Sequence, residues 1–348
     1  MLKYLLYPVT VIYCFLSNLN KYLTESKKLY KPVISIGNIT WGGSGKTPMT
    51  IEVAKYILSL GKNPVILSRG YKRKNTKIKN VVVRDNNKIL VNIFDCGDEP
   101  YMMANQLNCP IIVGANRYES AKKAKEFAPD IFILDDGFQH WKIKRDLDIV
   151  CVNSLNPFGN SMIIPAGILR EKKSALKRAN LIVLTNCNLS DKQNIENIKK
   201  EIFKITDQLP IETSCKNYEI VSMKDNIKIA DINIFKEQYS FVVISAIGSP
   251  ENFINTVENL GLKIKDKYLF SDHHRYTKQE IINIIEKLSN NEKIITTAKD
   301  AVKISEVINE NIKEKIYVLN ISIYFESGKG ILEKEIKKLI ESNNEQTK

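Results

Sequence analysis

The sequence predicts an α/β fold, and three observations predict it. A glycine-rich stretch lies between an apolar run at Val33–Ile36 and a helical run at Pro48–Leu60. Further along, short apolar runs alternate with helical segments, which is typical of a parallel sheet covered on both faces. At Phe241–Gly248 a second series of the same kind begins. We therefore predict a P-loop-type, mostly parallel sheet with helices on both faces, a second smaller α/β domain and an N-terminal hydrophobic helix.

The N-terminal element is the apolar run Tyr4–Leu19, which several lysines follow directly. As a helix, these sixteen residues would span about 24 Å, less than the ~30 Å hydrocarbon core of a bilayer. The following residues do not resemble a signal-peptide cleavage site. We expect residues 1–28 to form a membrane-associated helix; the alternative is a hydrophobic helix packed on the domain or at a dimer contact.

The next element is the strand, glycine loop and helix around Gly42, Gly43 and Gly45. Glycines let backbone N–H groups approach phosphate oxygens, and a helix N-terminus adds positive potential there. Lys46 is expected to reach the β- and γ-phosphates, and the Thr47 hydroxyl to bind Mg²⁺. The predicted loop consists of Thr40, Trp41, Gly42, Gly43, Ser44, Gly45, Lys46 and Thr47, with Thr40 at the position of the usual first glycine. The alternative is an ordinary glycine turn before a helix.

The remaining elements follow in order. Five more strands of the first domain are expected at 64–68, 81–84, 110–113, 131–134 and 148–152, and another at 181–185. Helices are expected from Asp98 and over 119–127. The second series has strands at 241–246, 293–297 and 316–319, and helices at 250–260 and 330–342. We expect domains at 1–28, 29–210 and 211–348, the last with the C-terminal helix.

Two acidic pairs are candidates for the chemistry. Asp135 and Asp136 follow an apolar strand, where a carboxylate beside the glycine loop would supply the oxygen ligand that Mg²⁺ needs. An Asx turn with Gly137 is the alternative. Asp98 and Glu99 begin a helix, where compensation of the helix dipole would also explain them.

The chain has three histidines, His140, His273 and His274, each in a polar, motif-like segment. A histidine can orient or tune a carboxylate base near neutral pH. A His-His pair can also bind a metal, but no third ligand is evident near His273 and His274. A surface loop is the remaining alternative.

Composition narrows the class of protein. The net charge of +13 suits an anionic partner, namely nucleic acid, an acidic membrane surface or a phosphorylated substrate; a lysine-rich genome would explain it equally well. The six cysteines have no CxxC and no metal-ligand spacing, so we expect reduced thiols in a reducing compartment.

Taken together, the motifs resemble those of the tetraacyldisaccharide 4′-kinase family of lipid A biosynthesis. The resemblance covers about residues 1–305, and its motifs occur in order: Gly37-Asn-Ile-Thr-Trp-Gly-Gly-Ser-Gly-Lys-Thr-Pro48, Ser68-Arg-Gly-Tyr71, Gly97-Asp-Glu-Pro100, Asp135-Asp-Gly-Phe-Gln-His140, Asp272-His273 and Thr296-Thr-Ala-Lys-Asp-Ala-Val302. The departures are Trp41 and Ser44 within the loop, and Lys72 after Tyr71.

The resemblance implies ATP- and Mg²⁺-dependent phosphorylation of the 4′-hydroxyl of a tetraacylated glucosamine disaccharide 1-phosphate. It also implies a membrane-associated N-terminal helix, two α/β domains bridged by a small β linker, and a location on the cytoplasmic face of the inner membrane. The catalytic residues it implies are Asp98, paired with His273 as the base, and Lys46; His274 leaves the choice of histidine open.

Within this scheme, we expect Mg²⁺ ligands among Thr47, Glu99, Asp135 and Asp136. Substrate contacts are expected from Arg69, Arg117, Gln139 and His140, the two arginines binding the 1-phosphate. Base and glycine loop come from different domains, so domain closure is expected to assemble the site.

Two other classes are less consistent with the sequence. A P-loop GTPase needs an Asn-Lys-x-Asp loop, which Leu184–Asn188 does not provide. A nucleic-acid binder would interleave aromatic residues with a basic stripe, and the lysine groups here lack them. We therefore expect a lipid substrate and no nucleic acid.

Overall fold

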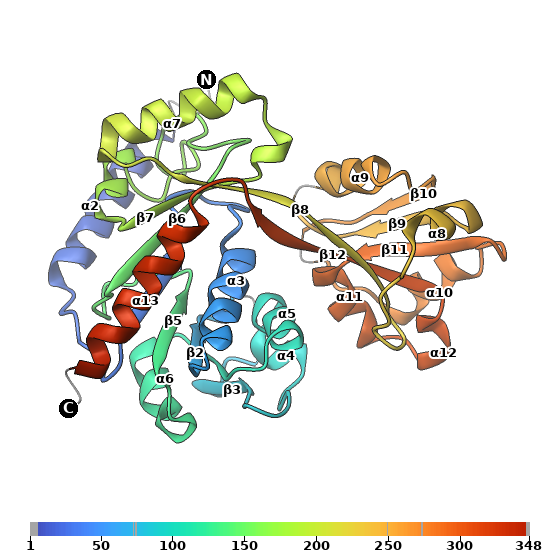
Figure 1. The fold of residues 1–348 in the computed structure, drawn as a ribbon, viewed down its shortest axis with the longest axis horizontal. Coiled ribbons are helices and arrows are strands. Elements are labelled where there is room, and N and C mark those ends of the chain that lie inside the picture. The colour runs from blue at the N-terminus through green and yellow to red at the C-terminus, as the bar shows by residue number, and fades with distance from the viewer. Residues whose placement is uncertain (1–5, 72, 74, 249, 273, 346–348) are drawn as a thin grey trace. The chain divides into compact units, whose positions relative to one another are not determined.

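The computed structural model describes residues 6–71, 73, 75–248, 250–272 and 274–345, shown in Figure 1. The chain divides into two compact units. Unit 1 comprises Met1–Lys216 and Ile323–Lys348, and unit 2 comprises Asn217–Ser322. This division differs from the boundary expected at residue 210, because the chain returns to unit 1 at its C-terminal end.

Unit 1 is built on a sheet with the strand order β8-β7-β6-β1-β5-β2-β4-β3. All neighbours pair in parallel except β3, which is antiparallel to β4. The strands are β1 (Val33–Gly37), β2 (Pro64–Ser68), β3 (Asn80–Arg84), β4 (Ile111–Gly114), β5 (Ile131–Asp135), β6 (Leu147–Asn153), β7 (Leu181–Thr185) and β8 (Ile211–Ser222). Strand β1 lies between β5 and β6 and runs parallel to both. The loop that follows β1 therefore lies between the loops that follow β5 and β6.

Helices cover both faces of this sheet, as the apolar strands predict. On one face, Ile34 and Ile36 of β1 pack with residues of α3 (Lys46–Ser59) and α5 (Asp98–Gln106). On the other face, Val33 packs with residues of α6 (Arg117–Lys123). Further along that sheet, β6 and β7 pack with α7 (Lys192–Thr206). The shorter helices of unit 1 are α4 (Ile93–Cys96), η1 (Ala124–Phe127), η2 (Lys173–Arg178) and η3 (Cys187–Leu189).

The C-terminal helix α13 (Lys329–Glu345) belongs to unit 1, although we expected it in the second domain. Its residues Leu332, Ile336 and Ile340 are buried in the same cluster as Ile34 of β1. Figure 1 shows this helix in red beside β6 and α3. The apolar positions of an amphipathic helix do not specify which sheet it covers, so the sequence alone could not make this assignment.

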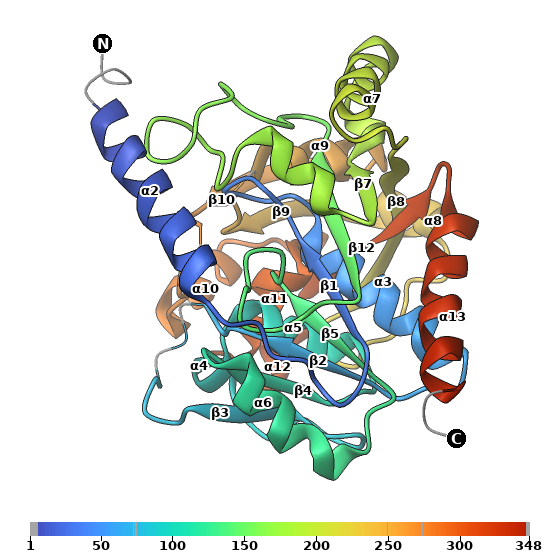
Figure 2. The ribbon, with the colours of Figure 1, turned by 90° about the vertical axis from the view of Figure 1, so that its left-hand side faces the viewer.

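The N-terminal helix is α2 (Tyr7–Leu23), which Figure 2 shows in blue along one side of unit 1. Its attachment is partly polar: the Thr10 hydroxyl accepts a hydrogen bond from the Ala166 N–H at 3.2 Å. Near its other end, the Lys21 ammonium lies 4.7 Å from the centre of the Trp141 ring. Within the described parts of the chain, no helix is both long and apolar enough to cross a bilayer.

Unit 2 is a smaller α/β domain. Its strands follow the order β10-β9-β11-β12 and pair in parallel. They are β9 (Ser240–Ser245), β10 (Ile264–Leu269), β11 (Glu292–Thr297) and β12 (Ile316–Phe325). The helices are α8 (Ile232–Gln238), α9 (Pro250–Asn259), α10 (Lys278–Ile285), α11 (Ala298–Ser305) and α12 (Glu310–Lys313). Phe241 and Val243 face one buried cluster, whereas Val242 and Ile244 face another, so this sheet is also covered on both faces.

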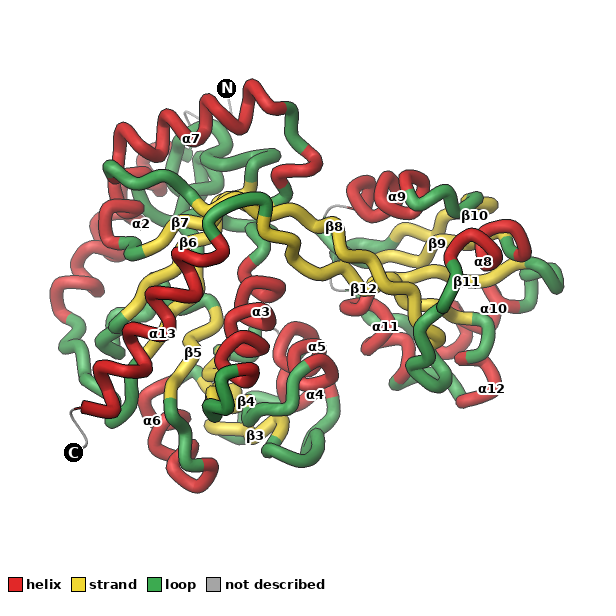
Figure 3. Tube along the Cα trace, in the orientation of Figure 1, coloured by secondary structure: helices red, strands yellow, loops and turns green. Residues whose placement is uncertain are grey.

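The long strands β8 and β12, visible in Figure 3, each contribute residues to both units. Hydrogen bonds from Glu326 N to Glu212 O (2.9 Å) and from Met223 N to Ile316 O (3.0 Å) show that the two strands run antiparallel. The sequence around β8 has a weak signal, and we did not predict this strand. The α/β fold class itself is confirmed.

Candidate active site

The glycine loop that follows β1 is held in place from two neighbouring strands. The Asn153 side chain, at the end of β6, donates a hydrogen bond to the Gly43 carbonyl at 3.0 Å. The Thr185 hydroxyl, at the end of β7, donates to the Ser44 carbonyl at 3.2 Å. Gly45 precedes the first turn of α3 with a positive φ of 77°, a conformation that favours glycine. The loop therefore leads directly into α3, whose first residues are Lys46 and Thr47.

The first part of the predicted loop is hydrogen-bonded to another segment of unit 1. The Trp41 N–H donates to the Ile168 carbonyl at 2.6 Å, and Thr40 forms an antiparallel bridge with Leu169. The Trp41 amide is thus committed to the protein and not to a phosphate. In addition, the Asn38 side chain donates to the Thr40 carbonyl at 2.8 Å, which orders the first part of the loop.

The double aspartate lies beside the glycine loop. A Cβ on Gly37, at the end of β1, would come within 2.5 Å of the Phe138 Cβ, so the two segments touch closely. Asp135 ends β5 and is only 2% exposed. Asp136 follows it, and its carboxylate lies 3.6 Å from the Lys46 ammonium. The structure therefore brings together Lys46 and both aspartates that the sequence singled out.

The two aspartates have opposite electrostatic environments. Burial, together with the charge of Asp136, raises the pKa of Asp135, although the Ser68 hydroxyl donates to its carboxylate at 2.9 Å. Burial also tends to raise the pKa of Asp136, but Lys46 and Arg170 outweigh it and hold this pKa below its ordinary value. Arg170 Nη1 lies 2.9 and 3.0 Å from the two Asp136 carboxylate oxygens. Asp136 is thus a paired anion, whereas Asp135 is a buried carboxylate that a cation would stabilise.

The helix that begins with Asp98 is connected to the same edge of the sheet. Ser68, which contacts Asp135, ends β2 and is followed by Arg69, Gly70 and Tyr71. A Cβ on Gly97 would come within 2.8 Å of the Tyr71 carbonyl, so this loop packs against the residue preceding α5. Asp98 is half-buried and Glu99 is exposed in the first turn of that helix.

The expected substrate residues have diverse positions in unit 1. Arg69 is exposed, whereas Arg117 is 4% exposed and donates to the Asp136 carbonyl at 3.2 Å. Gln139 donates to the Asn38 carbonyl and to Glu171, both at 2.9 Å. Burial, with Arg117 and Arg145 adding to it, lowers the pKa of His140 to about 3, so this imidazole is neutral. Arg117 and Gln139 therefore support the site from within, while Arg69 presents a charge to solvent.

The histidine pair of unit 2 is described in part. His273, the predicted partner of Asp98, lies outside the described residues. His274 stacks on Phe270 with a centroid distance of 4.5 Å, and its Nε2 lies 3.3 Å from Glu280. His274 is thus packed into its own domain. Next to the pair, Lys299 and Asp272 form an ion pair at 3.1 Å.

Sequence reasoning missed Arg170, Glu171 and Arg178, which form a charged network behind the double aspartate. Arg178 forms two hydrogen bonds to Glu171, at 2.9 and 3.0 Å, and Glu171 also accepts from Gln139. Their sequence context carries no motif. Asn153 and Thr185, by contrast, had a usable signal: both stand at the carboxyl end of a predicted parallel strand, where ligand sites gather.

The residues present fit a magnesium ion. Mg²⁺ is usually held by one or two carboxylates together with water and substrate phosphates, not by a cage of protein ligands. Asp135 and the half-buried Thr47 supply such a donor set. Because Asp135 is buried, a cation bound there would stabilise its ionised carboxylate. Among the described residues there is no group of three or more His, Cys, Asp or Glu side chains suited to a metal, so phosphate oxygens would have to complete the shell.

Comparisons with known proteins identify the family of the chain. The profile of the family described as Tetraacyldisaccharide-1-P 4′-kinase (LpxK) matches residues 2–341. The tetraacyldisaccharide 4′-kinase of Elusimicrobium minutum is 36% identical over 337 residues, covering 94% of this chain and 89% of the relative. That of Halothermothrix orenii is 35% identical over 334 residues, covering 88% and 83%. The solved structure of Aquifex aeolicus LpxK in complex with ATP has a TM-score of 0.76 at 29% identity, covering 98% of this chain and all of that one.

Proposed function

The chain belongs to the tetraacyldisaccharide-1-P 4′-kinase family, and from this premise we propose how its residues carry out the reaction. The enzyme phosphorylates the 4′-hydroxyl of the tetraacylated disaccharide 1-phosphate precursor of lipid A, with ATP as phosphate donor. The observation that carries the residue assignment is the 3.6 Å approach of Lys46 to Asp136, which joins the glycine loop to the double aspartate.

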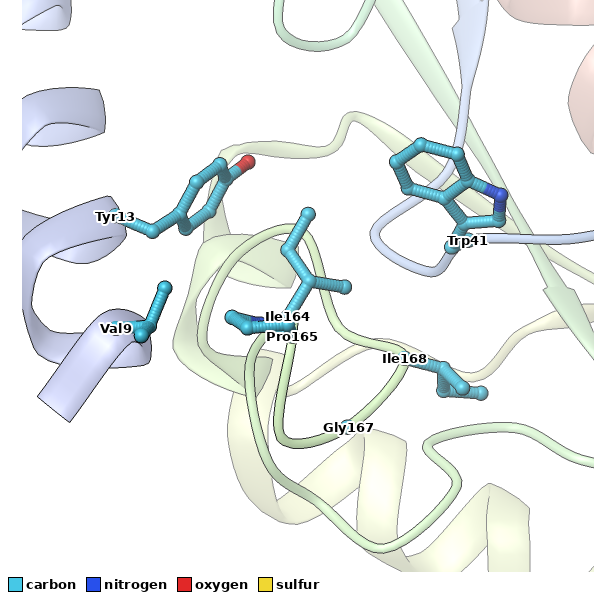
Figure 4. Close-up of a pocket in the computed structure, with 7 residues that line it drawn as sticks. All are labelled: Val9, Tyr13, Trp41, Ile164, Pro165, Gly167 and Ile168. Carbon is cyan, nitrogen blue, oxygen red and sulfur yellow. The ribbon is translucent and has the colours of Figure 1, made fainter. Parts of the chain in front are cut away.

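We assign the phosphate-binding role to Gly42, Gly43, Ser44 and Gly45, with Lys46 on the β- and γ-phosphates. The anchoring of the Gly43 and Ser44 carbonyls by Asn153 and Thr185 supports this assignment, because a preorganised loop pays less entropy on binding. Thr40 shapes the entry to the loop. The Trp41 amide is bound to Ile168, so only the side chain of Trp41 is available to a ligand at the loop (Figure 4).

Thr47 and Asp135 would hold Mg²⁺, whose chemistry is to neutralise negative charge on the transferring phosphate. Asp136 acts as the counter-ion that holds Lys46 and Arg170 in place, which its ion pairs support. Glu99 remains a candidate for a water-mediated contact to the metal.

Asp98 is the proposed base. It accepts the proton of the sugar hydroxyl while that oxygen forms a bond to the γ-phosphorus and the bond to the ADP oxygen breaks. The packing of the Ser68–Tyr71 loop between Asp135 and the start of α5 supports its placement. His273 as its partner follows from the resemblance, and the packing of His274 against Phe270 favours His273 over its neighbour.

The substrate is a lipid, and we propose that α2 lies on the membrane surface at the cytoplasmic face of the inner membrane. Large apolar side chains of this helix are exposed, among them Ile12 (58%), Phe15 (65%), Leu16 (56%) and Tyr22 (88%). A contiguous exposed apolar face of this kind is typical of interfacial helices. Arg69 is the described residue that we assign to the 1-phosphate.

The experiment that tests this function is incubation with γ-labelled ATP and tetraacyldisaccharide 1-phosphate in mixed micelles. A labelled bis-phosphorylated lipid that requires Mg²⁺ is the expected product. The Asp98→Asn variant serves as a matched control, because it should bind ATP but transfer no phosphate. Label released only as inorganic phosphate, with no lipid product, would contradict the proposal.

A further inference from the structure

Asp300, in the motif Thr296–Val302, is a charged residue that unit 2 buries completely. It lies in the first turn of α11, and its carboxylate lies 2.7 Å from the ammonium of Lys303, one turn further along the helix. The side chains of Asp300 and Lys303 are 0% and 5% exposed. A buried ion pair often stabilises a fold no better than apolar residues of the same volume would. Its presence here therefore points to a role in positioning its neighbours.

The Asp300 carboxylate joins the ends of two strands of unit 2. It accepts a hydrogen bond from the Ala246 N–H, directly after β9, at 3.0 Å, and from the Thr297 hydroxyl, at the end of β11, at 2.8 Å. The Asp300 N–H donates back to the Thr297 hydroxyl at 3.0 Å, so Thr297 caps α11. These contacts fix Asp300 at the carboxyl edge of the parallel sheet, the edge at which open α/β sheets place their functional groups.

The buried ion pair also faces Tyr276, which is 4% exposed. The Lys303 ammonium lies 5.3 Å from the centre of the Tyr276 ring. Burial, to which the charge of Asp300 adds, raises the pKa of Tyr276, so its hydroxyl is protonated and can serve as a donor to Asp300. Tyr276 is thus held by charges on α11, although it belongs to the segment that connects β10 to α10.

That segment, residues 270–277, carries the Asp272-His273 motif. His273 itself lies outside the described residues, but the chain is tied to α11 on both sides of it. Before it, Lys299 pairs with Asp272 at 3.1 Å. After it, Tyr276 meets the buried ion pair. The start of α11 therefore contacts this segment at two points.

We propose that α11 positions His273 for catalysis: Asp300 and Lys303 hold Tyr276, and the segment fixed in this way presents His273 in one conformation. This inference rests on the proposed function, in which His273 is the partner of Asp98. It makes Asp300 and Tyr276 positioning residues, because they act through His273 and not on the substrate.

The effect of releasing the segment is measurable. A catalytic group displaced by about 1 Å can lower a rate by ~100-fold. Because the ion pair of Lys299 with Asp272 remains, we expect Tyr276→Phe to lower kcat about 10-fold. Asp300→Asn leaves the Lys303 ammonium buried without its partner and can unfold unit 2. Tyr276→Phe, which removes a single hydroxyl, is therefore the decisive variant.

The first test follows His273 without measuring activity. The chain has three histidines, so NMR of the full chain with isotope-labelled histidine resolves their rings, and His273→Ala identifies the signal of interest. Tyr276→Phe should shift the His273 signal and leave that of His140 in unit 1 unchanged. Val257→Ala is the matched control, because Val257 is also buried in unit 2 but belongs to the cluster on the other face of the sheet.

The control should leave the His273 signal in place. A His273 signal that does not respond to Tyr276→Phe would overturn the proposal. An equal shift in Val257→Ala would also overturn it, because it would show a general response of unit 2 to lost packing. A melting curve for each variant establishes that it is folded.

The second test is kinetic. The kcat of lipid phosphorylation is measured for Tyr276→Phe in the wild-type protein and in the His273→Ala variant. If Tyr276 acts only through His273, its ~10-fold effect should shrink to less than about 2-fold in that background. A loss of the same size in both backgrounds would show an independent role and would overturn the inference.

Failure of the proposed function has a different signature. A wild-type kcat in His273→Ala would remove His273 from the reaction and would overturn the proposed dyad together with this inference. An inactive His273→Ala beside a Tyr276→Phe variant with wild-type kcat and an unshifted His273 signal would refute this inference alone.

Discussion

Replacing Asp135 by asparagine should abolish phosphate transfer and at the same time make the protein more stable. The substitution removes one negative charge and keeps the size of the side chain. If Asp135 binds Mg²⁺, we expect kcat to fall at least about 100-fold, since loss of even an outer-shell partner of a metal typically costs ~10–100-fold.

The gain in stability follows from the position of the side chain. Asp135 is 2% exposed and accepts hydrogen bonds from Ser68 at 2.9 Å and, more weakly, from Thr50 at 3.4 Å. A buried ion costs several kcal/mol of desolvation, whereas exchanging an ionised for a neutral acceptor loses about 1 kcal/mol. The substitution also removes the favourable electrostatic interactions of Arg117 and Lys46 with the Asp135 carboxylate. We expect a net rise in unfolding free energy of about 1–2 kcal/mol near pH 8, or about 2–6 °C in Tm.

The pH dependence supplies a second check. Burial, with the charge of Asp136, raises the pKa of Asp135 in the folded state. Because of this raised pKa, protonation of Asp135 stabilises the folded state of the wild type. That contribution is complete below the ordinary aspartate pKa of ~4 and is lost as the pH rises through the folded-state pKa. The Tm difference between variant and wild type should therefore be largest at alkaline pH and should shrink on acidification.

Asp136→Asn is the matched control, because the pKa of Asp136 is held below its ordinary value: burial tends to raise it, but Lys46 and Arg170 prevail. The same substitution there should lower the Tm at neutral pH. The assay is a thermal melt by circular dichroism across a pH series, without nucleotide. An Asp135→Asn variant that melts below the wild type at alkaline pH, or whose Tm difference does not vary with pH, would refute the reasoning.

Four further outcomes are expected. Lys46→Ala should nearly abolish turnover and leave the fold intact, with a cooperative melting curve as the check; near-normal activity in the folded variant would contradict its role on the phosphates. Deleting Met1–Leu23 should move the protein to the soluble fraction after salt and carbonate washes and raise the KM for lipid; a deletion protein that still pellets would show that the anchor lies elsewhere. Asp98→Asn and His273→Ala should each lower kcat strongly, and the double variant should be little worse than either, whereas multiplicative losses would show independent roles. Ile336→Ala in α13, fully buried in the unit 1 core, should cost about 2–5 kcal/mol in the unfolding of unit 1, which denaturant titration would detect.

The sequence by itself determined the parts of this protein that depend on local order. The strand, glycine loop and helix around Lys46 are contiguous, and glycine, lysine and threonine at that spacing have few other uses. Asp135 and Asp136 are adjacent in the chain and end an apolar strand, so their place at the carboxyl edge of a parallel sheet follows from topology alone. For the same reason the α/β class and the kinase family were predictable.

Only the tertiary structure decided which residues support the site from a distance. Arg170 reaches Asp136 across 34 positions of sequence, and no sequence pattern indicates this contact. Asn153 and Thr185 reach the glycine loop across more than 100 positions; their places at the ends of predicted strands put them at the same edge of the sheet, but did not specify the contacts. The sequence placed Trp41 within the glycine loop, and the structure adds that its backbone N–H donates to the Ile168 carbonyl. The C-terminal helix α13 belongs to unit 1 because its apolar side chains pack against the sheet that contains β1, about 300 residues earlier in the chain. Side-chain pairing and the choice of sheet depend on which surfaces meet in three dimensions, and amphipathic periodicity specifies only that a surface must be covered.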